Sequence, residues 1–248
     1  MLNQRDITIL DFPIDNINMP EAVSRVEEFI SKRTPHQVIT ANTLMLNSAL
    51  RDPSLKTVFN QASLVVPDSV GLVWAARALG HPLKAKVPGI DLLFELVNLC
   101  LARGYSIYLL GAKPGVAAKA AERLQTRFPG LKIAGTRHGY FARAEETAVI
   151  EDIQRSGASI LFVGFSIPYQ ELWINAHLAE INIPVCIGVG GSFDVICGRI
   201  KRAPQLMQKL GLEWLWRTLM EPWRIKRIIL IPVFILRVYR QKWLGNNK

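Results

Sequence analysis

The sequence predicts an α/β fold: a doubly wound, mostly parallel, Rossmann-like sheet with a helical C-terminal appendage. Short apolar runs alternate with segments of helical periodicity, which is the pattern of parallel strands joined by crossover helices. Polar or glycine-rich turns follow most of the apolar runs. Because the composition changes near residue 199, we expect an α/β core over residues 1–198 and the appendage over residues 199–248.

The elements follow in order from apolar runs, periodicity and turn signals. Strands are expected at residues 7–10, 37–40, 64–66, 106–110, 132–136, 160–164 and 185–189. Helices are expected at residues 19–32, 70–79, 90–101, 116–128, 144–155, 170–180 and 206–220. Pro20 suits the first turn of the first helix. The core side of that helix is expected to hold Ala22, Val26, Phe29 and Ile30.

Asp68 stands at the exit of the strand expected at 64–66. Pro67 ends that strand, because proline has no N–H to donate to a ladder. Ligands of open α/β sheets bind at the carboxyl ends of the strands, so Asp68 is a candidate for chemistry there. The structural alternative is that Asp68 caps the following helix by accepting its free N–H groups.

Polar residues and glycines follow the other strands as well. Thr40 and Asn42 are either capping residues or contacts to substrate hydroxyls. Gly111 and Gly115 bound a strand–turn–helix segment that can present backbone N–H groups to a phosphate, although a plain tight turn explains it equally well. The segment is neither a Walker loop nor a GxGxxG fingerprint.

Two further strand exits complete the set. Glu171 falls in the first turn of a helix, where an acidic side chain suits the helix dipole, and Gln170 has a weaker structural explanation. Gly190 and Gly191 form a second glycine-rich exit, and Asp194 just beyond it is either a cap or a ligand contact. Because parallel strands end at one edge of a sheet, these residues are expected to converge, which favours a functional role for Asp68.

The C-terminal residues carry the whole net charge of +10. Residues 199–248 contain 12 Lys and Arg but only Glu213 and Glu221 as acids, which indicates an anionic partner: nucleic acid, a membrane surface or a phosphate-bearing substrate. The apolar run 228–236 is too short to span a bilayer. Its flanking basic residues and tryptophans are typical of a segment in a membrane interface, and a helix packed on the core is the alternative.

Cysteines and histidines give no sign of a metal or disulfide framework. The three cysteines are odd in number, lie in apolar surroundings and lack CxxC spacing, so we expect buried thiols in a reducing compartment. The sequence has no Asp-x-Asp motif and no pair of histidines at metal-ligand spacing, so we predict neither a metal site nor a cofactor. No apolar leader is visible at the N-terminus.

At this point the chain resembles the WecG/TagA/CpsF family of bacterial glycosyltransferases over roughly residues 5–230. Seven separated motifs carry the resemblance: TAN at 40–42, VPDSVG at 66–71, LGAKPG at 110–115, GYF at 139–141, GFSIPYQE at 164–171, RAP at 202–204 and GLEWLWR at 211–217, followed by EP at 221–222. Each is weak alone, but seven in the family's order form a specific match.

The resemblance implies an inverting, metal-independent glycosyltransferase of bacterial surface polysaccharide or teichoic acid synthesis. The family is described as using UDP-sugar donors, notably of N-acetylmannosamine, and polyprenyl-diphosphate-linked N-acetylglucosamine acceptors. By resemblance, Asp68 matches the general base, Thr40, Asn42 and Gln170 match substrate-contacting or catalytic positions, and Asp194 matches a nucleotide contact. The implied place of action is the cytoplasmic face of the membrane, with the appendage docking on the anionic surface.

The appendage is also expected to close the site over the nucleotide. By resemblance, Arg217, Arg224 and Arg227 fall where the family supplies cationic residues, and they would do the work of a metal on the leaving diphosphate. Lys86 stands where the family often has arginine, which keeps the charge but not the bidentate fork. Ser69 replaces a common glycine. The exact sugar, the acceptor and the oligomeric state, a homo-oligomer included, stay open.

Two other readings compete with the transferase. A nucleotide-sugar dehydrogenase or epimerase would use a similar sheet, but GxGxxG is missing after the first strand. A basic nucleic-acid-binding module would use the charged tail, but this tail is unusually apolar, and its Trp and Ile residues suit an interface better than a phosphate groove. We therefore expect no nucleic-acid partner.

Overall fold

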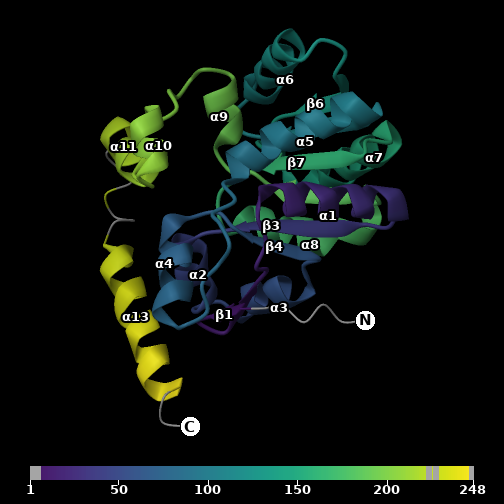
Figure 1. The fold of residues 1–248 in the computed structure, drawn as a ribbon. Coiled ribbons are helices and arrows are strands. Elements are labelled where there is room, and N and C mark those ends of the chain that lie inside the picture. The colour runs from purple at the N-terminus through teal and green to yellow at the C-terminus, as the bar shows by residue number, and fades with distance from the viewer. Residues whose placement is uncertain (1–6, 222–224, 226–228, 246–248) are drawn as a thin grey trace.

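The computed structural model describes residues 7–221, 225 and 229–245 (Figure 1). Its centre is a six-stranded, entirely parallel sheet in the order β4-β3-β8-β7-β5-β6. The strands are β3 (His36–Ala41), β4 (Leu64–Pro67), β5 (Ser106–Gly111), β6 (Lys132–Arg137), β7 (Ile160–Gly164) and β8 (Val185–Gly188). The predicted α/β class and the predicted parallel sheet are confirmed.

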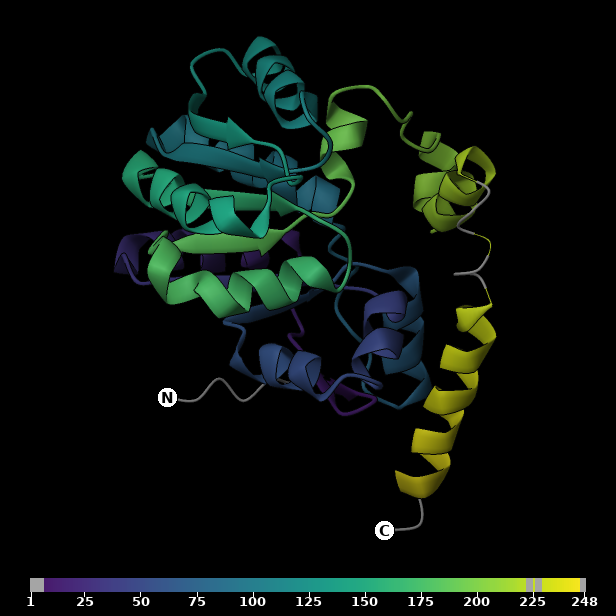
Figure 2. The ribbon, with the colours of Figure 1, turned by 180° about the vertical axis from the view of Figure 1, so that it is seen from behind.

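Helices cover both faces of this sheet, as Figures 1 and 2 show from opposite sides. One face packs against α1 (Met19–Lys32), α5 (Gly89–Arg103), α6 (Val116–Arg127) and α9 (Ser192–Ile196). The other packs against α2 (Thr43–Ala49), α3 (Pro53–Gln61), α4 (Val70–Ala78), α7 (Glu146–Ser156) and α8 (Tyr169–Ile181). The short 3-10 turn η1 (Arg143–Glu145) precedes α7. The core-facing side of α1 consists of the four residues that its periodicity predicts.

The crossover helices change faces between β5 and β7. The helix that follows β5, α6, packs on the first face, whereas α8, which follows β7, packs on the second. Adjacent strands whose connections leave on opposite faces open a crevice at their carboxyl ends, and ligands of doubly wound sheets bind there.

An N-terminal hairpin stands apart from the sheet. Strand β1 (Ile7–Ile9) is predicted, but it pairs antiparallel with β2 (Phe12–Ile14), for which the sequence gives no signal. Leu10 and Asp11 at the turn both have positive φ angles, a conformation that usually calls for Gly or Asn. The hairpin forms because Ile9, Phe12 and Ile14 are fully buried against α2, α3 and α4.

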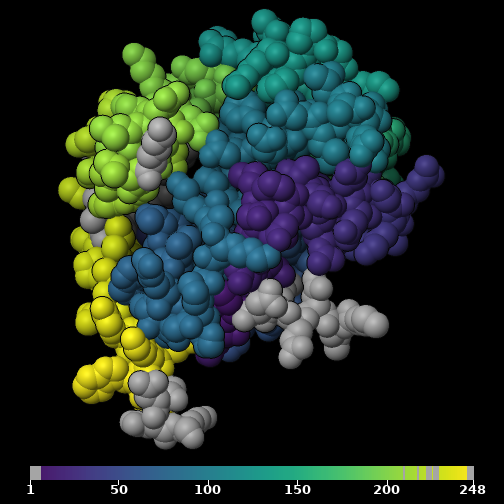
Figure 3. Space-filling view, viewed as in Figure 1, coloured from purple at the N-terminus to yellow at the C-terminus, as the bar shows by residue number. Residues whose placement is uncertain are grey.

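Among the described C-terminal residues, the helices α10, α11 and α13 lie along one side of the molecule (Figures 1 and 3). The single helix expected at 206–220 is wrong: α10 (Gln205–Lys209) and α11 (Glu213–Met220) are separate. Gly211 lies between them with a φ of +71°, and a Cβ there would come 2.9 Å from Cβ of Val70 on α4. The glycine therefore lets the chain turn sharply and approach the core.

The last helix, α13 (Leu230–Gly245), packs on the core through one side. Phe234 and Val238 are buried in the cluster that holds α2 and α4. Gln241 accepts a hydrogen bond from the backbone N–H of Leu10 at 2.8 Å. The opposite side exposes large apolar side chains, with Leu236 69% and Trp243 77% exposed. Within the described residues, no helix is long and apolar enough to cross a membrane.

Candidate active site

Asp68 is held at the carboxyl edge by the start of α5. Its backbone N–H donates to the carbonyl of Ala41 at 2.8 Å, and its Oδ1 accepts from the N–H of Gly89 at 2.6 Å. Ser69 rather than Asp68 is the N-cap residue of α4, and the Ser69 side chain makes no capping hydrogen bond. Gly89 is the first residue of α5, and the N-terminus of a helix favours negative charge. The fold thus presents a half-buried carboxylate where the sequence predicts one.

Thr40 joins the Asp68 segment to the end of β8. Its buried hydroxyl donates to the carbonyl of Gly188 at 3.0 Å. A Cβ on Gly89 would come 3.2 Å from the Thr40 methyl group, so the threonine is packed against the residue that binds Asp68. Asn42, by contrast, caps α2: its Oδ1 accepts from the N–H of Met45 at 3.0 Å. The capping alternative for Asn42 is confirmed.

Glycines line the other half of this edge. Gly111 has a φ of +130°, and a Cβ there would come 2.6 Å from the carbonyl of Gly164 on the neighbouring strand. A Cβ on Gly164 would come 2.8 Å from the ring of Phe193 and 3.1 Å from the carbonyl of Gly190. The ends of β5, β7 and β8 therefore approach one another backbone to backbone, which any larger side chain would prevent.

The turn from Gly111 to Gly115 is tight and bonded internally. The N–H of Ala112 donates to the carbonyl of Gly164 at 2.9 Å, and the N–H of Val116 donates to the carbonyl of Lys113 at 3.0 Å. Gly115 caps α6 in a left-handed conformation with a φ of +81°. Two of the backbone donors near the turn are thus used within the protein, as the plain-turn alternative expects.

Gln170 and Glu171 lie beneath the end of β8. Both are buried in the first turn of α8. The Gln170 Oε1 accepts from the N–H of Gly190 at 3.0 Å, and its Nε2 donates to Oε1 of Glu171 at 2.6 Å. The other carboxyl oxygen of Glu171 has no hydrogen-bond partner. Burial raises the pKa of Glu171 to about 8, so helix-dipole stabilisation of an exposed anion does not describe this residue.

The turn after β8 leads to Asp194. Gly190 has a φ of +50°, and Gly191 precedes α9. The Ser192 hydroxyl donates to the carbonyl of Val189 at 2.7 Å, which closes the turn. Asp194 is half-buried in the short α9, 3.5 Å from a guanidinium nitrogen of Arg199.

Ion pairs tie the appendage to the Asp68 side of the edge. Lys86 Nζ lies 3.7 Å from Oε2 of Glu213 on α11, and Arg202 Nη2 donates to Oδ1 of Asp91 on α5 at 2.5 Å. Arg202 Nε lies 3.8 Å from the other Glu213 oxygen. In Figure 2 the arrowheads of the sheet point toward the side on which α10 and α11 lie. Sequence reasoning gave Arg202, Asp91 and Glu213 no role, although RAP and GLEWLWR are among the family motifs.

One of the three arginines expected to act on the diphosphate lies within the described residues. Arg217 lies on α11, whereas Arg224 and Arg227 are outside the described residues.

The three cysteines are all free and buried, as predicted. In the described part of the chain, no group of three or more His, Cys, Asp and Glu residues is placed to hold a metal ion.

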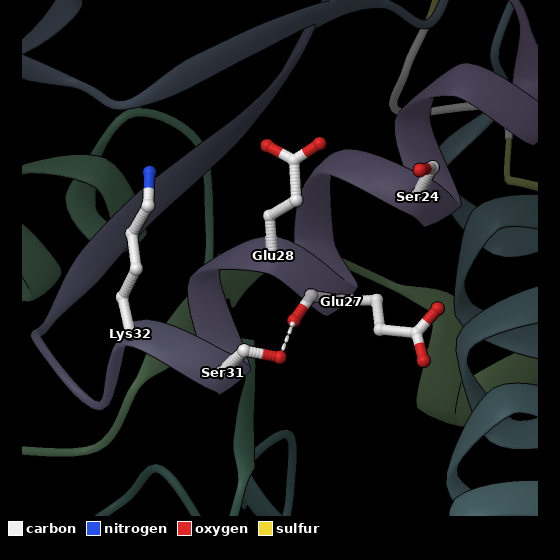
Figure 4. Close-up of a pocket in the computed structure, with 5 residues that line it drawn as sticks. All are labelled: Ser24, Glu27, Glu28, Ser31 and Lys32. Carbon is white, nitrogen blue, oxygen red and sulfur yellow. Dashed lines mark hydrogen bonds between the residues drawn. The ribbon is translucent and has the colours of Figure 1, made fainter.

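Two surface hollows lie outside the converging residues. One is lined by side chains of α1 alone, as Figure 4 shows: Ser24, Glu27, Glu28, Ser31 and Lys32. The other, of about 260 Å³, lies where α13 meets α2 and is lined by Asn47, Ser48, Arg51, Asp52, Leu55, Pro168, Leu230 and Arg237. Neither hollow contains a predicted site residue.

Comparisons with known proteins identify the family. A sequence profile described as "Glycosyl transferase WecG/TagA/CpsF family" matches residues 7–248. An N-acetylglucosaminyldiphosphoundecaprenol N-acetyl-beta-D-mannosaminyltransferase of Staphylococcus aureus strain MW2 is 34% identical over 242 residues, which cover 97% of this chain and 94% of that protein. The protein with the same description from strain MRSA252 matches with the same identity and coverage.

The raised pKa of Glu171 predicts that the stability of the protein depends on pH. Its pKa is about 8 in the folded protein against an ordinary 4.5, so between these values the folded state keeps a proton that the unfolded state has released. The retained proton therefore stabilises the folded state at low pH. As the pH rises between these values, the free energy of unfolding is expected to fall by up to ~1.4 kcal/mol per pH unit. Glu171→Gln removes this contribution. Urea unfolding at pH 5, 6, 7 and 8 measures it, and equal pH slopes for both proteins would contradict the assignment.

Proposed function

The chain belongs to the WecG/TagA/CpsF glycosyltransferase family, and from that premise we propose that it transfers N-acetylmannosamine, or a related sugar, from a UDP-linked donor. The proposed acceptor is polyprenyl-diphosphate-linked N-acetylglucosamine, the substrate that the relatives' names contain in undecaprenol form. Glycosyltransferase membership sets aside the dehydrogenase, epimerase and nucleic-acid alternatives. The observation that carries the proposal is the Asp68 carboxylate, fixed at the carboxyl edge of the sheet, where glycines let the ends of the neighbouring strands pack closely.

The proposed reaction is a single inverting displacement. Asp68 removes the proton from the acceptor hydroxyl, whose oxygen attacks the anomeric carbon of the donor from the side opposite the diphosphate. The bond to the diphosphate breaks as the new glycosidic bond forms, and negative charge moves onto the leaving UDP. Cations near that charge lower the barrier.

The appendage is the proposed source of these cations. Arg217, Arg224 and Arg227 are its candidates by family resemblance. Lys86 is a fourth, on the loop before α5, and its pairing with Glu213 places α11 next to that loop. Because the chain has no Asp-x-Asp motif, we propose that these side chains do what a divalent metal does in other sugar transferases.

The outer surface of the appendage supports membrane docking. Its exposed apolar side chains are Leu206, Leu210, Trp214, Leu219, Met220, Ile225, Ile229, Leu236, Tyr239, Trp243 and Leu244. They are interspersed with most of the tail's 12 Lys and Arg residues. Apolar groups that enter the headgroup region, with cations that meet anionic lipids, are what peripheral binding requires. We place the enzyme on the inner face of the membrane, where its lipid-linked acceptor would lie.

A donor and acceptor panel tests the reaction itself. Purified full-length protein is incubated with UDP-N-acetylmannosamine, UDP-N-acetylglucosamine or UDP-glucose and a short-chain polyprenyl-diphosphate acceptor. We expect transfer from the first donor, unchanged in rate by EDTA. Activity that EDTA abolishes and Mg²⁺ or Mn²⁺ restores would overturn the metal-independent part of the proposal, and no transfer from any donor would overturn the rest.

Asp68→Asn tests the base. The asparagine keeps a side-chain oxygen for the Gly89 N–H, so the fold is expected to survive, while loss of a general base lowers kcat by about 10²–10⁴-fold. The control is Asp52→Asn, since Asp52 caps α3 and asparagine caps equally well. The test is to measure kcat for both variants and for the unaltered protein. Near-normal turnover in Asp68→Asn would show that Asp68 has a structural role and is not the base.

Vesicle sedimentation tests the docking surface. Replacing Leu236 and Trp243 on the exposed side of α13 with serine should lower binding to vesicles with anionic lipid, because less apolar surface enters the interface. Leu101→Ser, an exposed leucine on α5, is the control and should bind like the unaltered protein. Full-length protein that ignores anionic vesicles at low salt would refute the docking proposal.

A further inference from the structure

We propose that Glu171 is a positioning residue of the donor site: one carboxyl oxygen orients the Gln170 amide, which in turn holds the Gly190 turn that leads to Asp194. The inference rests on the proposed function, because the donor nucleotide is what this turn is expected to contact. Neither the family motifs nor the helix-dipole explanation gave Glu171 this role.

The orientation follows from donor and acceptor chemistry. An amide has one accepting end and one donating end. The Gly190 N–H requires the accepting end of Gln170, which lies 3.0 Å away, so the donating end must face Glu171, whose Oε1 lies 2.6 Å away. A flipped amide would set two donors against each other at Gly190. Glu171 supplies the acceptor that keeps Gln170 in the productive orientation.

Burial leaves little freedom for replacement. Gln170 and Glu171 are each 1% exposed. They pack over Gly188, where any Cβ would collide with Nε2 of Gln170 and come 3.0 Å from Oε1 of Glu171. With no partner for the donating end of Gln170, a buried polar group would be unsatisfied, which is costly enough to displace the side chain.

The held turn packs on the glycine at the end of β7. The Gly190 carbonyl lies 3.1 Å from the position of a Cβ on Gly164, so movement of the turn changes the packing at the carboxyl edge of the sheet directly. On its far side the turn is closed by Ser192, and Asp194 follows within the same short helix. Gln170 is therefore the link between buried Glu171 and the surface that is expected to meet the donor.

A carboxyl group is an unusual side chain at a position as buried as 171. Its second oxygen has no hydrogen-bond partner, and burial raises the pKa of Glu171 to about 8, so the residue is largely neutral at pH 7. Burying such a group costs free energy that an apolar side chain would not. What glutamate supplies and leucine cannot is the acceptor for Gln170.

The experiment compares Glu171→Gln, which keeps an acceptor oxygen, with Glu171→Leu, which removes it, in the full-length protein. Calorimetry gives the Kd of UDP, steady-state kinetics give KM and kcat for the donor, and hydrogen exchange gives the protection of the Gly190 amide. We expect Glu171→Leu to raise Kd and the donor KM about tenfold or more, to change kcat less than threefold, and to expose the Gly190 amide. Glu171→Gln should stay within about threefold of the unaltered protein.

Two controls separate positioning from folding. Tyr108→Phe removes another side-chain hydrogen bond, the partly buried one from the tyrosine hydroxyl to Asp152, and should lower the melting temperature without changing the Kd of UDP. If Glu171→Leu does not fold, the double variant Gln170→Leu/Glu171→Leu carries the test, because it leaves neither side chain with an unsatisfied group and still releases Gly190. It should raise the Kd of UDP to a similar extent.

Three results would overturn the inference: UDP binding and Gly190 protection unchanged in the leucine variants, equal losses in Glu171→Gln and Glu171→Leu, or a fall in kcat alone. Failure of the proposed function looks different. The unaltered protein would then bind no UDP, while the Gly190 amide would still lose protection in Glu171→Leu.

Discussion

The pairing of β3 with β8 is the constraint on which the rest of this structure depends. It joins β3, which carries Thr40, and β4, which Asp68 follows, to the strands whose ends pack closely at glycines. The two strands are far apart in the sequence, so the contact must overcome a large loop-closure entropy. It does so through the buried parallel ladder, and the Thr40 hydroxyl extends it by one hydrogen bond to the carbonyl of Gly188. The Asp68 carboxylate and the glycine-rich strand ends thus lie along one edge of the sheet.

Polar groups beneath this edge are bonded to one another. Gln37 on β3 is buried and donates to the backbone carbonyl of Glu171, while Asn175 one turn further along α8 reaches the Gln37 amide at 3.4 Å. With Gln170 and Gly190 they connect the interior of the second face to the site. Networks of this kind fix side-chain orientation, because each member has few alternatives once water is excluded. The network is incomplete at Oε2 of Glu171, which has no hydrogen-bond partner.

The appendage faces two environments at once. Through Phe234 and Val238 it contributes to the core, and through the Arg202–Asp91 pair it contacts the helix that also binds Asp68. Its other side is apolar and cationic. The Glu213–Lys86 pair and the start of α5 connect that side of the appendage to Asp68.

The sequence alone determined the fold class, all six strands of the central sheet and the placement of the candidate residues that follow those strands at one edge. Periodicity and turn residues are local, and the convergence follows from parallel topology. Tertiary structure decided what local patterns cannot contain. Asp68 resembles a cap in sequence, yet it accepts from Gly89, because β4 and α5 meet only in the folded chain. Glu171 resembles a dipole residue, yet packing over Gly188 buries it and raises its pKa. The β1–β2 hairpin and the break at Gly211 likewise depend on burial and close approach between distant segments, which no local window of sequence records.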